Sequence, residues 1–219
     1  YVYFNLPVFK GAGVAVPVFS LKSKQSFGVG DFSDLKIMID WAVSTNQKLV
    51  QVLPLNDTTM THTWTDSYPY NSISIYAFHP MYADLQKMGK LKDAEKMAYF
   101  AEKQTKLNAK STIDYEAVNK AKWEYFRLIF KQEGQKVLKS KAFKQFFLNN
   151  KEWLQPYAVF SCLRDQYNTP DFRKWPKCSS YIQEEIDELC QPESKDYEEI
   201  AIYYYIQFHL HLQLFEAST

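Results

Sequence analysis

The sequence has 219 residues, of which 17% are aromatic, and its 26 basic and 25 acidic residues give a net charge of +1. This length suits one large domain, or one domain with an appended piece. The balanced charge shows no basic stripe, so we expect no nucleic-acid partner. No apolar run reaches about 18 residues, and no basic and apolar leader is visible, so we expect no membrane partner.

The cysteines predict a reducing environment. Cys162, Cys178 and Cys190 are widely spaced and form no CxxC pair. An odd number of unpatterned cysteines argues against a secreted disulfide framework. We therefore expect buried thiols and a cytoplasmic location.

Residues 1–85 have the pattern of an α/β protein. The run GVAVPVFSL (13–21) predicts a strand, and a helix is expected to begin near Ser33, with Asp31 or Ser33 as its cap. Asn46 occupies the position of a left-handed helix terminator. Apolar residues at spacings of three and four give this helix one apolar face. They are Leu35, Met38, Ile39 and Ala42.

A second strand is predicted over the nearly continuous apolar run 49–55, which is typical of a strand covered on both faces of a parallel sheet. Together the three elements predict a βαβ unit with a right-handed crossover. Ligand sites in parallel α/β folds lie beyond the carboxyl ends of the strands. Asn56 and Asp57 stand at that end, after Pro54 disrupts the ladder.

The loop over residues 57–80 is crowded with rings, hydroxyls and carboxylates. Aromatic rings stack on the apolar faces of sugars, while carboxylates and amides bond their hydroxyls. The loop therefore favours a ligand with both properties. In the alternative interpretation, Trp64 and Tyr76 are core residues and the polar residues form turns. The residues concerned are Trp64, Tyr68, Tyr70, Tyr76, Asp66, Ser67, Asn71 and Ser72.

Residues 86–219 are predicted to be mainly helical. One helix is indicated around 114–133, and Pro156 is expected to open or kink another helical segment. A last helix over 194–217 is apolar around its circumference, so we expect it to be buried against the rest of a barrel or another chain. Its principal stripe is Ala201, Tyr204, Phe208, Leu212 and Phe215.

Other chemistries find little support in the sequence. Gly28 and Gly30 precede a helix, but the third glycine of a nucleotide fingerprint is missing, so a tight turn is favoured. The histidines show no metal-binding spacing, and we expect no metal site. No GxSxG motif is present. Asp57 and Asp66 are the candidate carboxylate pair for glycoside chemistry, although Asp57 fits a loop-fixing role better.

Four stretches, in order along the chain, resemble the 4-alpha-glucanotransferases, which are also called amylomaltases or disproportionating enzymes. They are PVFSLKSKQSFGVGDFSDLKIMIDWA (17–42), LVQVLPLNDTTMTHTWTDSYPYNSISIYAFHPMY (49–82), DYEAVNKAKWEYF (114–126) and WLQPYAVFSCLRDQYNTPDFRKWP (153–176). The form HTWTDSYPY resembles the longer subclass, which often carries starch-binding domains ahead of the barrel. Because the chain also begins at Tyr1 rather than at Met, we expect a segment of a longer protein.

The resemblance implies an α/β fold of the (β/α)8 TIM-barrel type. Residues 1–85 would supply the first two strands and helix with a substrate-binding loop, and residues 86–219 a helical insertion subdomain. The family implies no cofactor. The implied partners are a maltooligosaccharide or α-glucan, the remainder of the barrel, and starch-binding domains in the full-length protein.

The implied reaction is a retaining transfer of an α-1,4-glucan segment between maltooligosaccharides. The family's catalytic carboxylates would lie beyond Thr219, so no catalytic residue is expected in this chain, which alone should be inactive. Tyr70 matches a family tyrosine that touches glucose near the scissile bond, while Tyr68 stands where shorter members have serine. The predicted substrate-binding residues are Tyr70, Asp66, Ser67, Asn71, Asn56, Asp57, Trp64 and Tyr68.

Two other functions remain open at this point. The main one is a non-catalytic α-glucan-binding module, which would use the same aromatic loop. The other is a helical interaction domain that self-associates through the helix predicted over 194–217.

Overall fold

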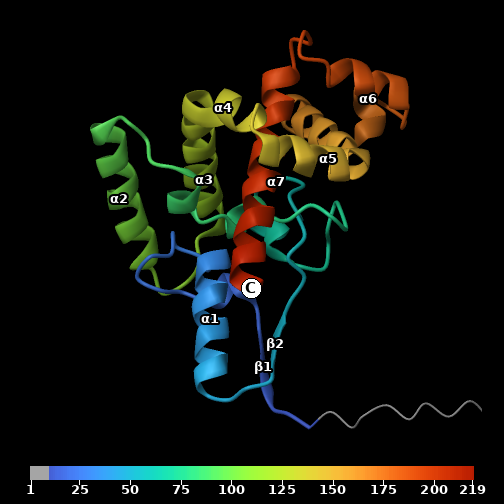
Figure 1. Ribbon diagram of the computed structural model, residues 1–219. Helices are drawn as coiled ribbons and strands as arrows, with labels where there is room; N and C mark the ends of the chain where they lie inside the picture. Colours follow the sequence, from blue (N-terminus) through green and yellow to red (C-terminus); the bar gives the residue numbers. More distant parts are fainter. Residues whose placement is uncertain (1–9) are drawn as a thin grey trace, which may run out of the picture.

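A computed structural model of the chain describes residues 10–219, so the first nine residues of the predicted region 1–85 lie outside the described part. Strands β1 (Gly13–Val16) and β2 (Leu49–Val52) pair in parallel, and helix α1 (Phe32–Ser44) connects them (Figure 1). The predicted strand–helix–strand unit is therefore confirmed. A Cβ atom on Gly13 would lie 2.2 Å from the carbonyl oxygen of Leu49, so the close pairing of the strands requires glycine there.

Helix α1 begins at a capping box. The carboxylate of Asp31 accepts hydrogen bonds from the backbone N–H groups of Ser33 (2.9 Å) and Asp34 (3.1 Å), and the Asp34 carboxylate accepts from the Asp31 N–H (3.1 Å). Of the two predicted caps, Asp31 is therefore the one used. Asn46 has φ of 58°, as expected for a left-handed terminator, and Gly28 has φ of 79°, as the predicted tight turn requires.

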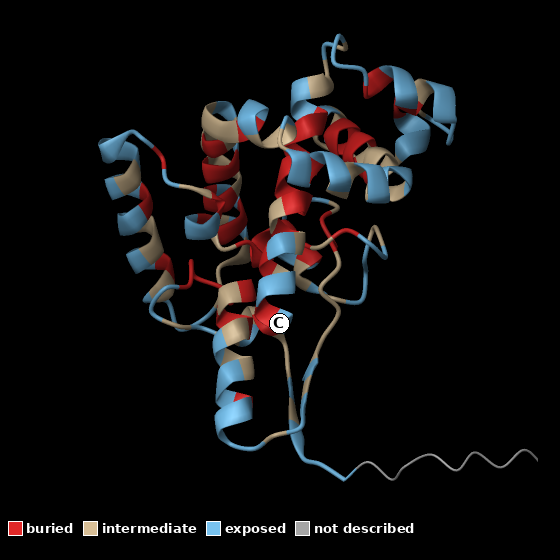
Figure 2. Ribbon diagram, in the orientation of Figure 1, coloured by how far each residue is buried: buried red, intermediate tan, exposed pale blue. Residues whose placement is uncertain are grey.

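Both strands are shorter than expected, and the prediction that the second is covered on both faces is wrong for the described residues. Pro17 is followed directly by the 3₁₀ turn η1 (Val18–Ser20), and β2 ends before Pro54. Side chains along each strand alternate between exposed and half-buried, because within residues 10–219 the sheet consists of β1 and β2 alone (Figure 2).

Helices dominate the rest of the chain, as predicted. Pro156 lies inside one continuous helix, α5, so it does not open a new one. Within residues 10–219, no helix is long and apolar enough to cross a membrane. The helices are α2 (Ala94–Asn108), α3 (Tyr115–Ile129), α4 (Gln135–Leu138), α5 (Lys141–Tyr167), α6 (Gln183–Leu189) and α7 (Tyr197–Ser218), with a π-helical segment η5 (Phe130–Gly134) and 3₁₀ turns η2 (Trp64–Ser67), η3 (Pro80–Tyr82), η4 (Leu85–Met88) and η6 (Phe172–Lys174).

Helix α7 runs through the middle of the molecule and packs against α1, α3 and α5 (Figure 1). Its residues from 200 to 208, together with Leu210, are buried (Figure 2). Over that part of α7, the other helices of this chain therefore provide the burial that the sequence predicted. Leu212 and Phe215, which belong to the predicted stripe, are 48% and 68% exposed.

A buried lysine joins α3 to the segment that follows the loop. Lys122 is 1% exposed, and its Nζ donates to the carbonyl oxygens of Met81 (2.6 Å) and Ala83 (2.8 Å). Burial lowers the pKa of Lys122, and the nearby carboxylates of Asp31 and Asp84 oppose that shift. One cation therefore satisfies two buried carbonyls and balances acidic groups at the start of α1.

We expect Lys122→Met to lower the free energy of unfolding by about 3–5 kcal/mol, because it leaves buried carboxylates without their cation. Urea denaturation measures the change. Lys120→Met, an exposed position on the same helix, is the matched control and should change stability by less than about 0.5 kcal/mol. Equal effects of the two substitutions would contradict this role of Lys122.

Candidate functional site

The loop that follows β2 is closed at its base by backbone pairing. Asn56 and Phe78 form an isolated antiparallel bridge. The N–H of Asp57 donates to the carbonyl of Ala77 (2.8 Å), and the N–H of Ile73 donates to the carbonyl of Asp57 (2.8 Å). Residues 57–77 therefore form a closed loop that starts at the carboxyl end of the parallel sheet, where the sequence predicted a ligand site.

Asp57 points into the protein. It is 1% exposed, its Oδ1 accepts hydrogen bonds from the N–H (2.9 Å) and the hydroxyl (2.6 Å) of Thr59, and its Oδ2 accepts from the Tyr157 hydroxyl (2.7 Å). Both carboxylate oxygens are thus bonded to protein groups. This arrangement fits the loop-fixing role that the sequence favoured for Asp57.

Asp66 holds the first half of the loop in a similar way. It is 7% exposed, and its Oδ2 accepts from the backbone N–H groups of Thr61 (2.9 Å) and His62 (2.7 Å). The Thr58 hydroxyl donates to the Asp66 carbonyl. Both members of the predicted carboxylate pair are therefore buried and hydrogen-bonded inside the loop.

A polar cluster on α5 and α7 fastens the loop to the helices. His62 Nε2 lies 2.7 Å from Asp165 Oδ1, and Arg164 Nε donates to the same oxygen at 2.8 Å. The Tyr203 hydroxyl donates to Asp165 Oδ2, and Arg164 Nη1 donates to the carbonyl of Thr59 at 2.7 Å. The cluster joins residues about a hundred positions apart, so sequence spacing did not reveal it. The signal was an Arg-Asp pair that directly follows the largely apolar stretch YAVFSCL (157–163) of α5.

The electrostatics of this cluster are set by its geometry. Burial raises the pKa of Asp165, but the hydrogen bonds and charges of His62 and Arg164 outweigh it and hold that pKa at about 2. Arg164 is 2% exposed, so its charge depends on Asp165 for compensation. Asp165 therefore stays ionised and keeps both partners in place over the physiological pH range.

The aromatic rings of the loop point outward. Trp64, Tyr68 and Tyr70 are 69%, 61% and 61% exposed, and the rings of Tyr68 and Tyr70 lie 5.5 Å apart. Tyr76 is 55% exposed and stacks on Trp153 at 5.8 Å. The alternative in which Trp64 and Tyr76 are core residues is therefore wrong.

The remaining predicted contact residues differ in their exposure. Asn71 is exposed, whereas Asn56 and Ser67 are half-buried. The N–H of Trp64 donates to Glu116 Oε1 on α3 at 3.0 Å, which anchors η2. The loop thus combines an inner layer of bonded carboxylates with an outer layer of rings and amides.

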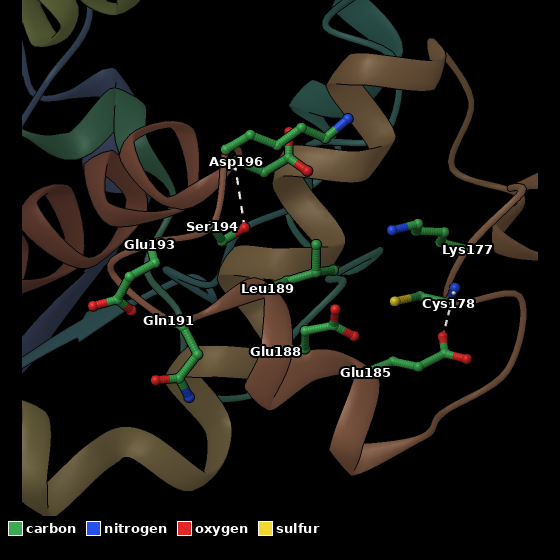
Figure 3. Close-up of a pocket in the computed structure, with 10 residues that line it drawn as sticks. Lys177, Cys178, Glu185, Glu188, Leu189, Gln191, Glu193, Ser194 and Asp196 are labelled. Atoms are coloured by element: carbon green, nitrogen blue, oxygen red, sulfur yellow. Dashed lines mark hydrogen bonds between the residues drawn. The ribbon is translucent and has the colours of Figure 1, made fainter.

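A separate, charged cavity of about 550 Å³ lies around α6 (Figure 3). Lys177, Cys178 and Glu185 lie on one side of it, and Ser194 and Asp196 on the other. Burial and the Glu185 carboxylate raise the pKa of the free thiol of Cys178 to about 11, so this cysteine is a poor nucleophile. In the described part of the chain, no three His, Cys, Asp or Glu side chains are placed to hold a metal ion.

Two solved structures share this fold. The amylomaltase from Corynebacterium glutamicum aligns with a TM-score of 0.70 at 18% identity, covering 94% of this chain and 28% of that one. The amylomaltase from Streptococcus agalactiae in complex with acarbose aligns with a TM-score of 0.72 at 19% identity, covering 95% and 40%. Amylomaltases have a TIM-barrel fold, so the βαβ unit is consistent with part of such a barrel.

The chain belongs to the 4-alpha-glucanotransferase family, whose model matches residues 16–219. It is 44% identical over 215 residues to the 4-alpha-glucanotransferase DPE2 of Oryza sativa subsp. japonica, covering 96% of this chain and 22% of that protein. It is 29% identical over 208 residues to the 4-alpha-glucanotransferase of Chlamydia pneumoniae, covering 94% and 38%. The predicted family is confirmed, and the chain spans about a fifth to two fifths of the length of these relatives.

We expect Asp165→Asn to lower the free energy of unfolding at pH 7 by about 2–5 kcal/mol, because Arg164 then lies buried without its counter-charge. A carboxyl whose folded pKa is depressed stabilises the fold above its unfolded pKa of about 4, and this contribution is lost as the pH falls towards 2. Urea denaturation at several pH values should therefore show that the free energies of unfolding of the wild-type and Asp165→Asn proteins converge as the pH falls from about 4 towards 2. Asp40→Asn, at an exposed surface pair on α1, is the control and should change the free energy of unfolding at pH 7 by less than about 0.5 kcal/mol.

Proposed function

We propose that the full-length protein is a 4-alpha-glucanotransferase and that residues 57–77 form part of its glucan-binding surface. The orientation of the loop carries this proposal. Its carboxylates are turned inward, where Tyr157 and neighbouring backbone groups bind them, while Tyr68 and Tyr70 present their rings to solvent. Exposed rings on a fixed loop suit the apolar faces of glucosyl units, and Asn71 and Ser67 supply polar groups beside them.

The transfer would proceed as a double displacement in the full-length protein. An aspartate oxygen bonds to the anomeric carbon while a glutamic acid protonates the leaving O4 of the glycosidic bond. The O4 hydroxyl of an acceptor glucan then attacks the same carbon, returns its proton to the glutamate and releases the aspartate. We place these carboxylates beyond Thr219, which agrees with the engagement of both Asp57 and Asp66 in the loop.

The division of the chain follows the same proposal. Residues 1–85 would form the start of the barrel and its substrate loop, and residues 86–219 a helical insertion. The parallel strands and α1 support the first assignment, and the succession of helices from α2 to α7 supports the second. Helix α7 packs on α1, so the two regions would share one core rather than fold as separate units.

A non-catalytic α-glucan-binding module is the second candidate. The observation that favours it is the same outward display of Tyr68 and Tyr70, because stacking on a glucan requires no catalytic carboxylate.

The deciding experiment measures glucose release and chain-length redistribution from maltotriose, for this chain and for the full-length protein in parallel. Activity in the full-length protein alone supports a transferase whose carboxylates lie outside these residues. Activity in the short chain contradicts that placement and returns attention to Asp57 and Asp66. Maltooligosaccharide binding without activity in either supports the binding module.

In the full-length protein, we expect Tyr70→Ala to reduce the transfer rate from maltotriose by about 10- to 100-fold, because a mispositioned substrate reacts slowly. Thermal unfolding should be nearly unchanged, since the ring is 61% exposed. Tyr99→Ala, at an exposed tyrosine on α2, controls for the loss of a surface ring. Unaltered kinetics of Tyr70→Ala would remove Tyr70 from the site.

A further inference from the structure

A second cavity, of about 370 Å³, lies between α5 and the segment that connects α5 to α6. Ile73 and Ser74 of the loop also line it, so it adjoins the segment that carries Tyr70. Its volume falls in the range of about 300–1,000 Å³ that is usual for small-molecule sites. Six rings contribute to its wall: Trp153, Tyr157 and Phe160 from α5, and Phe172, Trp175 and Tyr181 from the connecting segment.

The lining selects an uncharged ligand. Among the described residues that line the cavity, none is Asp, Glu, Lys, Arg or His, and the polar side-chain groups are those of Ser74, Ser180, Cys178, the two tyrosines and the two tryptophan indoles. A phosphate or carboxylate would find no counter-charge there and would lose its hydration. A neutral ligand with apolar faces and hydroxyl groups matches both the rings and the serines.

The inner rings are held firmly. Trp175 is 5% exposed, its Nε1 donates to the carbonyl of Thr169 (2.9 Å), and its ring lies 5.4 Å from that of Phe160. Trp153 stacks on Tyr76 (ring centroids 5.8 Å apart) and on His211 (5.7 Å). A wall of fixed rings needs little ordering when a ligand binds, which favours affinity.

Two rings of the lining remain open to solvent. Tyr181 is 68% exposed and Phe172 is 44% exposed. The Tyr181 hydroxyl donates to Gln183 Oε1 at 2.6 Å, which fixes the ring at the start of α6. These two side chains can therefore contact a ligand at its entrance, and each can be removed without opening the core.

We propose that this cavity is an accessory subsite that holds one glucosyl unit of a longer α-glucan. The inference rests on the proposed function, because the same chain would continue onto the rings of the adjoining loop. Tyr68 and Tyr70 do not line the cavity, so a short glucan bound at those rings leaves it unfilled. The subsite thus adds affinity for long glucans and none for short ones.

The test uses the full-length protein and compares maltoheptaose with maltotriose as substrates. For Tyr181→Ala, we expect the KM for maltoheptaose to rise about 3- to 10-fold through loss of one stacking contact, with kcat and the KM for maltotriose unchanged. Leu148→Ala is the matched control, because Leu148 is also 68% exposed, lies on α5 and does not line the cavity. Tyr181→Phe should retain most of the affinity for maltoheptaose.

A direct binding measurement separates this inference from the proposed function. Maltoheptaose should alter the tryptophan fluorescence of the full-length protein, since Trp153 and Trp175 line the cavity, and Tyr181→Ala should weaken that titration. If the full-length protein has no transfer activity but Tyr181→Ala still weakens the maltoheptaose titration, the subsite is supported and only the assignment as a transferase is contradicted. An unchanged KM and an unchanged titration overturn the subsite. Lower thermal stability of Tyr181→Ala with unchanged binding also overturns it, because the ring would then be covered by protein.

Discussion

The loop depends on one buried guanidinium. Arg164 is 2% exposed and donates to the carbonyl of Thr59 and to Asp165, which in turn binds His62 and Tyr203. A buried charge is tolerated only when each of its partners is in place. The loop residues Thr59 and His62 are therefore held at fixed positions on α5 and α7, although the loop contributes few side chains to the core.

Because of this attachment, the backbone conformation of the loop is fixed although its outer rings are exposed to solvent. In most loops, aromatic residues define the conformation by packing inward. Here Asp57, Asp66 and their hydrogen-bonding partners fix the backbone from the inside. Tyr68 and Tyr70 are consequently free of a packing role, and under the proposed function a backbone that is already fixed reduces the entropy lost when a glucan binds.

The elements that could be predicted from the sequence depend on local patterns. The helical spacing, the Asp31 cap and the Asn46 terminator act within a few residues, and the structure confirms each of them. The position of the loop at the end of β2 followed from the chirality and polarity of parallel sheets. Family motifs then supplied the barrel context that two short strands alone could not.

The features that could not be predicted depend on distant partners. The sequence favoured a loop-fixing role for Asp57 but could not show its partner, because Tyr157, whose hydroxyl donates to one oxygen of Asp57, lies a hundred residues away. The Arg164–Asp165 pair gave no spacing signal, because its partners lie on the loop and on α7. The sequence also did not predict that both strands are partly exposed, because an apolar run predicts a covered strand without specifying which element covers it.

Tyr157 connects the two surfaces of the molecule that could meet a glucan. Its hydroxyl donates to Asp57 Oδ2 at the base of the loop, while its ring lines the cavity beside α5. Burial and the Asp57 carboxylate raise the pKa of Tyr157 well above its ordinary value, so the hydroxyl remains a donor throughout the working pH range. One side chain therefore belongs both to the base of the loop and to the wall of the cavity.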